Sequence, residues 1–200
     1  MNTKEFLEAC NEAIKLNPND YAAYNNRGIT YKQIGRFDKA IEDFDKAIDI
    51  NPNCAEAYNN RGAAYRKIGQ INMSDEYFER AIEDFNRAIQ IDPNYFEEYF
   101  NRGNAYMFGL KQYEQAIADF DKAIEFKPDW ASAYNQRGAA YAYLGQYARA
   151  VQDYNKAIQF APHDFAAYFN CGRAYQGLGD EKKAQAFFDK ANKLYGQRLI

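Results

Sequence analysis

Histidine and cysteine are scarce in this chain, which has one histidine and three cysteines among its 200 residues. Cys10, Cys54 and Cys171 are far apart and form no CxxC spacing. His163 stands alone in a "PHDF" segment that is typical of a turn. Zinc sites need clustered histidine and cysteine ligands, so we expect no metal site. The cysteines are predicted to be free thiols in a reducing compartment.

Long apolar runs and an excess of one charge are also missing. No apolar stretch approaches the roughly 18 residues of a membrane-spanning helix, and the N-terminus has no basic segment followed by an apolar one. We therefore expect neither a membrane span nor a signal peptide, and a cytoplasmic location. The formal net charge is −3, which argues against nucleic acid as a partner, because that partner needs a basic surface.

Aromatic residues, in contrast, are abundant and regularly spaced. The chain has 18 tyrosines and 15 phenylalanines, and "YNNRGITY" at 24–31 recurs at 58–65, 99–106, 134–141 and 168–175. A proline closes each stretch of the form "DFDKAIDINP", at Pro18, Pro52, Pro93, Pro128 and Pro162, with separations of 34, 41, 35 and 34 residues. A glycine in mid-repeat and this proline predict two helices per repeat, each about a dozen residues long.

These residues resemble the tetratricopeptide repeat (TPR) family, whose unit is 34 residues long. The resemblance implies an all-α, right-handed solenoid of stacked antiparallel helix pairs. The first helix of each pair, helix A, would line the concave face, and the second is helix B. Repeat positions are counted from the first residue of each unit. The predicted units are a half repeat at 3–18 and five repeats at 21–54, 55–95, 96–130, 131–164 and 165–200.

Two repeats and both ends of the array depart from the pattern. Seven extra residues near 70–76 are predicted to start helix B earlier, with Ser74 or Asp75 as its cap, and one extra residue lies near Leu110. Phe6 replaces the small residue expected in a helix B that has a partner. Polar Gln185 and Asn192 replace the apolar residues that would pack on a following repeat, so we expect an array terminated at both ends.

Arginine occupies a helix-A position that the family usually fills with an apolar residue, in four repeats of five. An aspartate on helix B is present in the same four repeats, whereas the fifth has Cys171 and Phe187. An unpaired buried charge is costly, so this covariation predicts structural ion pairs within each repeat. The expected pairs are Arg27–Asp43, Arg61–Asp84, Arg102–Asp119 and Arg137–Asp153. Other helix-B acids, such as Asp45 and Glu83, are predicted to be solvated.

Catalytic constellations and glycine-rich phosphate loops are missing, so we expect no enzyme, no cofactor and no small-molecule substrate. The resemblance implies instead a protein-interaction scaffold that binds an extended peptide of a partner in the concave groove. A structural protein that homo-oligomerises through the array is the alternative, and we expect a monomer or a weak homo-oligomer. The family's carboxylate clamp uses lysine at repeat position 5, which no repeat here has.

The resemblance places helix-A positions 2, 5, 6, 9, 12 and 13 on the concave face, where the peptide would bind. Early repeats are basic there and later ones aromatic. The predicted set is Asn25, Asn26, Lys32, Asn59, Asn60, Arg66, Lys67, Phe100, Asn101, Asn104, Met107, Phe108, Asn135, Tyr143, Phe169 and Asn170. Two interpretations of the asparagines stay open: they bind peptide backbone, or they hydrogen-bond neighbouring helices.

Overall fold

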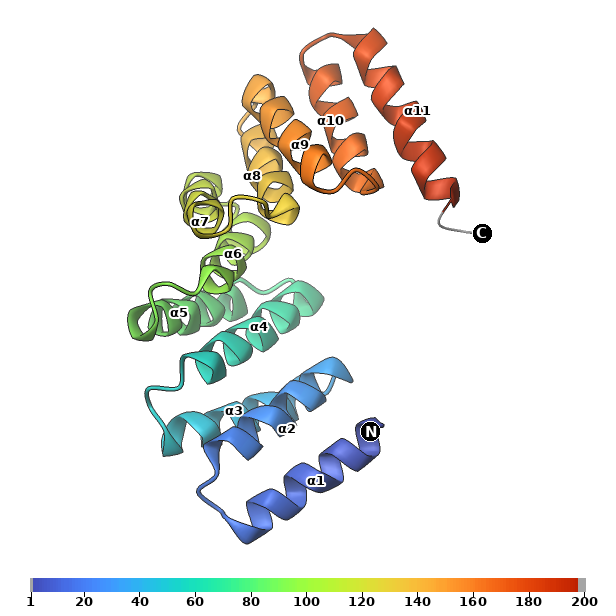
Figure 1. The fold of residues 1–200 in the computed structure, drawn as a ribbon. Coiled ribbons are helices and arrows are strands. Elements are labelled where there is room, and N and C mark those ends of the chain that lie inside the picture. Colours follow the sequence, from blue (N-terminus) through green and yellow to red (C-terminus); the bar gives the residue numbers. More distant parts are fainter. Residues whose placement is uncertain (1, 198–200) are drawn as a thin grey trace. The chain divides into compact units, whose positions relative to one another are not determined.

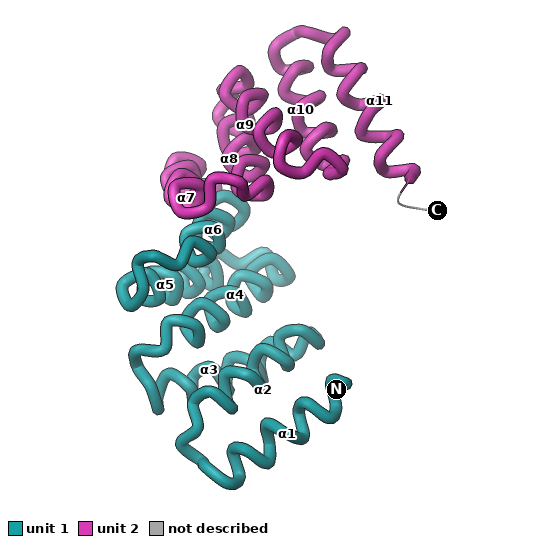
Figure 2. Tube along the Cα trace, viewed as in Figure 1, with its two compact units in different colours: residues 1–110 teal, residues 111–200 magenta. Residues whose placement is uncertain are grey.

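The computed structural model describes residues 2–197, which form eleven α-helices and one π-helical turn and contain no strand (Figure 1). The prediction of an all-α fold is therefore confirmed. The chain divides into two compact units, residues 1–110 (unit 1) and 111–200 (unit 2), coloured separately in Figure 2. Each unit is a stack of antiparallel helices.

Unit 1 begins with a lone helix, continues with two helix pairs and ends with a further helix A. Its elements are α1 (Thr3–Leu16), α2 (Tyr21–Gln33), α3 (Phe37–Ile50), α4 (Ala55–Asn72), α5 (Asp75–Ile91), α6 (Phe96–Ala105) and η1 (Tyr106–Leu110). Each helix packs on the next along the chain, and α2 also packs on α4.

Unit 2 begins with a helix B and continues with two helix pairs. Its elements are α7 (Tyr113–Phe126), α8 (Ala131–Tyr143), α9 (Tyr147–Phe160), α10 (Phe165–Gly177) and α11 (Glu181–Gln197). Here α8 pairs with α9 and α10 with α11, while α8 also packs on α10. His163 lies in the turn between α9 and α10.

The repeated glycine of helix A lets the two helices of a pair approach closely. A Cβ at Gly28 would lie 2.7 Å from the Phe44 ring and 3.1 Å from the Ala40 carbonyl oxygen. Phe44 and Ala40 are fully buried, and the same contact recurs at Gly62, Gly138 and Gly172. In these four repeats the glycine and the aromatic ring of the two helices therefore pack together in the core, because apolar burial is the main driving force for packing.

The seven extra residues of the second repeat lengthen both of its helices. Helix α5 begins at Asp75, with Ser74 at the N-cap position but no side-chain cap hydrogen bond. Most of the inserted residues lengthen helix α4, which reaches Asn72. The expectation that the insertion lengthens helix B alone was therefore incomplete. The turn between them uses Met73 with a φ of 52°, where most repeats place glycine.

Phe78 connects this extension to the extra residue of the third repeat. That residue is accommodated by the π-helical turn Tyr106–Leu110, which is followed by Lys111 with a φ of 54°. The Phe78 ring lies against the Gly69 backbone, and a Cβ on Gly109 would be only 2.2 Å from its Cγ. One aromatic ring thus fits between glycines of α4 and η1.

Candidate functional site

The repeated arginines hold the helices of each unit together. Arg27 Nε and Nη2 donate to the Asp43 carboxylate at 2.8 and 2.6 Å. Arg61 binds Asp84 at 2.9 and 2.6 Å, and Arg137 binds Asp153 at 2.8 and 2.6 Å. These bidentate geometries are strong charge-assisted hydrogen bonds. The fourth expected pair, Arg102 with Asp119, joins residues of different units and stays a prediction.

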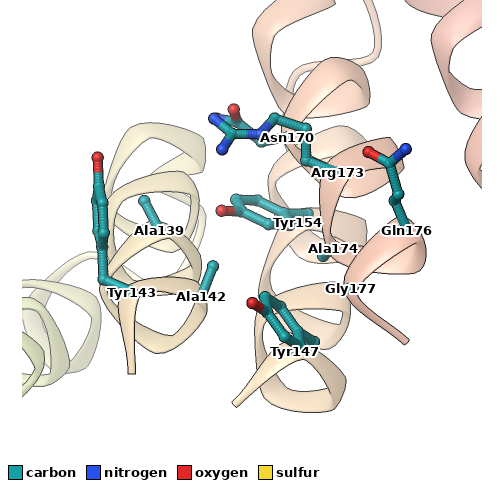
Figure 3. A pocket seen from close by; sticks show the side chains of 10 residues that line it. All are labelled: Ala139, Ala142, Tyr143, Tyr147, Tyr154, Asn170, Arg173, Ala174, Gln176 and Gly177. Carbon is teal, nitrogen blue, oxygen red and sulfur yellow. The ribbon is translucent and has the colours of Figure 1, made fainter. Parts of the chain in front are cut away.

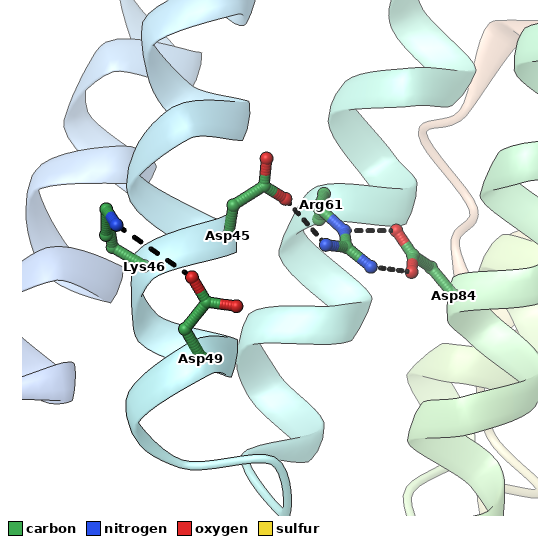
Figure 4. A network of polar contacts seen from close by, with 5 residues as sticks. All are labelled: Asp45, Lys46, Asp49, Arg61 and Asp84. Carbon is green, nitrogen blue, oxygen red and sulfur yellow. Dashed lines mark hydrogen bonds and ion pairs between the residues drawn. The ribbon is translucent and has the colours of Figure 1, made fainter.

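Each arginine also has a second partner that the sequence interpretation missed. Its Nη1 donates to the side chain sixteen residues earlier, on the helix B of the preceding repeat. In Figure 4, Arg61 on α4 lies between Asp84 of α5 and Asp45 of α3, with 2.6 Å to the Asp45 oxygen. Asp45 is solvated as expected, with its side chain 47% exposed, but the sequence interpretation did not include its bond to Arg61. The remaining partners are Asn11, Asn86 and Asp121.

The arginines are thus used in packing between adjacent repeats. Each guanidinium also lies over the tyrosine three residues before it, 5.4–5.6 Å from the ring centroid. The bonds to Asp153 raise the pKa of Arg137 above its ordinary value. The fifth repeat has an apolar version, in which Cys171 is fully buried and Phe187 stacks on Tyr175 at 5.3 Å. Burial raises the pKa of the Cys171 thiol to about 12.

The asparagines form bonds between neighbouring A helices. Nδ2 of Asn60 donates to Asn25 at 3.3 Å, and Asn101 donates to Asn59 at 3.1 Å. In unit 2, Asn170 donates to Asn135 at 3.1 Å. The helix-bonding interpretation therefore accounts for one N–H of each donor, and it leaves the second N–H available.

Three predicted peptide-binding residues are buried in the free chain. Asn25 and Asn104 are almost fully covered, and Met107 is 2% exposed within the π-helical turn. A ligand on the surface cannot contact these side chains without rearrangement, so their assignment as contact residues stays a prediction that requires such a rearrangement. For Met107 the reason is local, because the π-helical turn changes which face its residues present.

Two cations, Lys32 and Arg66, lie together on the helix-A face of unit 1 without a salt bridge among residues 2–197. Lys32 Nζ donates to the side-chain oxygen Oδ1 of Asn60 at 2.7 Å, and the buried Nε of Arg66 has no hydrogen-bond partner among residues 2–197. Burial and, next, the nearby Arg66 lower the pKa of Lys32. Burial also lowers the pKa of Arg66. Glu56 of α4 acts in the opposite direction on the pKa of Lys32, but neither cation forms a salt bridge within the described chain, so the positive charge of this face is only partly neutralised.

Predicted apolar and flanking residues remain accessible on both units. Phe108 of unit 1 is 47% exposed, and Asn26 and Lys67 are exposed as well. In unit 2, Tyr143 and Phe169 are exposed, and Tyr143 stacks on Tyr113 with ring centroids 4.9 Å apart. Phe100 is partly buried.

Unit 2 contains a pocket of roughly 530 Å³ between α8, α9 and α10 (Figure 3). Its lining includes predicted Tyr143 and Asn170 together with residues that the sequence interpretation missed. The full lining is Ala139, Ala142, Tyr143, Tyr147, Tyr154, Asn170, Arg173, Ala174, Gln176 and Gly177. A signal for Arg173 was available, because it is the only cation at repeat position 9.

Glu98 of α6 is a buried acid in a position that the other repeats fill with alanine. It is 1% exposed, and neither carboxylate oxygen has a hydrogen-bond partner in the described part of the chain. Burial raises the pKa of Glu98 to about 8. An uncompensated buried carboxylate favours its protonated form, so Glu98 holds a proton at neutral pH.

Stability should fall with rising pH because of Glu98. The folded carboxyl has a pKa of about 8 against 4.5 for the free group, so between these values the folded state binds more protons. The stabilisation is present below pH 4.5 and is lost as the pH rises to about 8. Glu98→Gln should remove this part of the dependence, as measured by urea denaturation across that range. Glu56→Gln, at an exposed acid of α4, is the control; an unchanged pH profile in Glu98→Gln would refute the assignment.

Among residues 2–197 no group of three or more histidine, cysteine, aspartate or glutamate side chains could hold a metal ion. No helix in the same range is long and apolar enough to span a bilayer.

Sequence profiles of the TPR family match most of the chain. Profiles described as "Tetratricopeptide repeat" match residues 21–54, 44–76, 131–164 and 165–198, and one described as "TPR repeat" matches 71–107 and 108–145. The chain belongs to the tetratricopeptide repeat family. A profile of the protein prenyltransferase alpha subunit repeat matches residues 3–34. Among curated proteins, none matches this chain.

Solved structures with a similar fold are TPR proteins. A crystal structure of MamA protein is 28% identical, with a TM-score of 0.76, covering 90% of this chain and 93% of that one. YrrB, described as a TPR protein with an unusual peptide-binding site, is 23% identical, with a TM-score of 0.74 and coverage of 94% and 93%. MamA from Desulfovibrio magneticus RS-1 (residues 41 to the end) is 21% identical, with a TM-score of 0.78 and coverage of 88% and 96%. These likenesses support an α-solenoid fold.

Proposed function

We propose that this chain is a non-enzymatic interaction scaffold that binds an extended, acidic peptide segment of a partner protein on its helix-A faces. This proposal rests on the two adjacent cations Lys32 and Arg66. Two like charges held together and partly removed from water raise the free energy of the unliganded chain. An acidic ligand residue would relieve this cost, which gives the face a physical preference for carboxylates.

The neighbouring side chains complement such a ligand. The second N–H of Asn60 and of Asn101 can donate to a peptide carbonyl, while Phe108 offers an exposed apolar anchor. Buried aromatic anchors usually contribute most of the binding energy at interfaces, whereas exposed charges such as Lys67 mainly affect rate and salt dependence.

Binding to unit 1 should depend on both Arg66 and Phe108. Short random peptides displayed on phage, panned on the full chain, should enrich acidic sequences that bind with a dissociation constant near 1 μM, about −8 kcal/mol. Arg66→Gln should weaken binding of the enriched peptide by roughly 1.5–3 kcal/mol, because a charge-assisted hydrogen bond is lost. Phe108→Ala should cost roughly 1–3 kcal/mol. Fluorescence anisotropy measures both.

A stability measurement separates binding from a structural role. Arg66→Gln should leave the free energy of unfolding unchanged or raise it, since it removes an unpaired buried charge. Arg80→Gln is the matched control, because Arg80 is half exposed and pairs with Glu76 on its own helix. Enriched peptides that bind the Arg66→Gln and Phe108→Ala variants as tightly as wild type would refute the proposal. A stable homo-oligomer in sedimentation that excludes peptide would favour the self-assembly alternative instead.

A further inference from the structure

Arg173 is a cation that faces a pocket without an acid. It is exposed, and it forms no ion pair or hydrogen bond within residues 2–197. None of the residues lining the pocket between α8, α9 and α10 is acidic. In Figure 3, its guanidinium extends from α10 toward Asn170 and lies beside Tyr154. The pocket therefore has one uncompensated positive charge at its rim.

The remaining polar groups in the pocket are hydroxyls and side-chain amides, each of which can donate a hydrogen bond. The hydroxyl ends of Tyr147 and Tyr154 point from α9 into the space beside α8 (Figure 3). Burial raises the pKa of Tyr154, so its phenol keeps its proton and can donate. Asn170 uses one N–H for Asn135 and has a second available. Several donors around one cation suit an anion with more than one acceptor oxygen.

Small residues create the space for this ligand. Ala139, Ala142 and Ala174 line the walls, and position 13 of this repeat is Gly177. A Cβ at Gly177 would lie 2.8 Å from the Tyr147 ring, so the glycine lets that ring lie against α10. Position 13 carries a larger side chain in the other four repeats. The volume is therefore specific to this pair of repeats, and its tyrosine and alanine surfaces are apolar.

We propose that this pocket binds an aspartate or glutamate side chain of the peptide together with the apolar residue next to it. The inference rests on the proposed function and adds a second acidic anchor, on unit 2. Arg173 pairs with the carboxylate, the two phenols donate to it, and the apolar neighbour lies against the alanines and tyrosine rings. Charge complementarity selects this occupant, because the single unpaired cation matches a single carboxylate.

A continuing peptide fits better than a chain end. The side-chain amide oxygen of Asn170, Oδ1, lines the same pocket as Arg173 and accepts no hydrogen bond in the described structure. It can accept from a backbone N–H, whereas it would repel a terminal carboxylate. Arginine at position 9 with asparagine at position 6 also differs from the family's clamp for chain ends, which needs lysine at position 5.

Capped dipeptides test the pocket on the full chain. The probe is acetyl-Leu-Glu-amide, followed by NMR of the Arg173 Nε–Hε and the tyrosine ring signals. Its uncharged analogue, acetyl-Leu-Gln-amide, should bind about tenfold more weakly, the loss of one charge-assisted hydrogen bond. Acetyl-leucine, which supplies a terminal carboxylate, should also bind more weakly than the glutamate probe.

Arg173→Gln should abolish the preference for the glutamate probe over the glutamine probe. Arg149→Gln, at an exposed arginine of α9 outside the pocket, should leave the preference unchanged. Equal binding of the two dipeptides, an unchanged preference in Arg173→Gln, or tighter binding of acetyl-leucine would each overturn the inference. Unit 1 is tested independently by the phage-selected peptides and Arg66→Gln. If those peptides bind and the dipeptides do not, only the pocket assignment fails.

Discussion

Replacing Phe78 by alanine should destabilise the chain by roughly 3–5 kcal/mol. The ring is 4% exposed and contacts helix α4 at Gly69 and the π-helical turn at Gly109. Removing it leaves a cavity between two rigid glycine backbones that cannot collapse easily, because neither glycine has a side chain to move inward. Urea denaturation followed by far-UV circular dichroism measures the loss.

Phe37→Ala is the matched control, at the same repeat position on α3. Phe37 is only partly buried and has no glycine partner, so its loss should be smaller. Gly109→Ala should cost about 1–3 kcal/mol by overpacking against the ring. In the Phe78→Ala background that cost should largely disappear, since the clash is gone. Additive effects of the two substitutions would contradict the packing described.

The repeat pattern predicts most of the fold, because each residue of the motif has one packing role. Glycine, alanine and aromatic recur at fixed spacing, and the structure places them in contact, as with Gly28, Ala40 and Phe44. The sequence predicts where the insertion lies but not which of the two helices it lengthens, because helical propensity allows either helix to be longer. The π-helical turn was not predictable, because its residues pack on Phe78, which is distant in sequence.

The candidate site was less predictable, because covariation within one chain reveals only partners that change together. The helix-B residue is aspartate, as at Asp43, where helix A has arginine, and it is Phe187 where helix A has cysteine. This joint change made the pairing predictable. The second partner is aspartate or asparagine in every repeat, and it stays asparagine at Asn155, where the arginine is replaced. It therefore gave no covariation signal. Burial of Met107 depends on local backbone geometry, which repeat position alone does not specify.

Asp153→Ala should cost roughly 2–4 kcal/mol of unfolding free energy. The aspartate side chain is 6% exposed and its partner Arg137 is 19% exposed, so the substitution leaves a largely buried guanidinium with its main carboxylate missing. Arg137→Cys together with Asp153→Phe copies Cys171 and Phe187 of the fifth repeat. This double variant should cost clearly less than the sum of the single variants, because both charges are removed and apolar contacts replace them.

Asp121→Ala distinguishes the two partners of the same arginine. Asp121 also lies 2.6 Å from Arg137, but its side chain is 52% exposed, so water can replace the lost bond. This variant should cost at most about 1 kcal/mol. Urea denaturation monitored by the fluorescence of Trp130, the single tryptophan, gives the losses of all five variants on one scale. Equal losses of unfolding free energy in Asp121→Ala and Asp153→Ala would show that burial does not determine how much each aspartate contributes to stability. Strict additivity in the cycle would show that the fifth repeat's apolar pair is not an equivalent replacement.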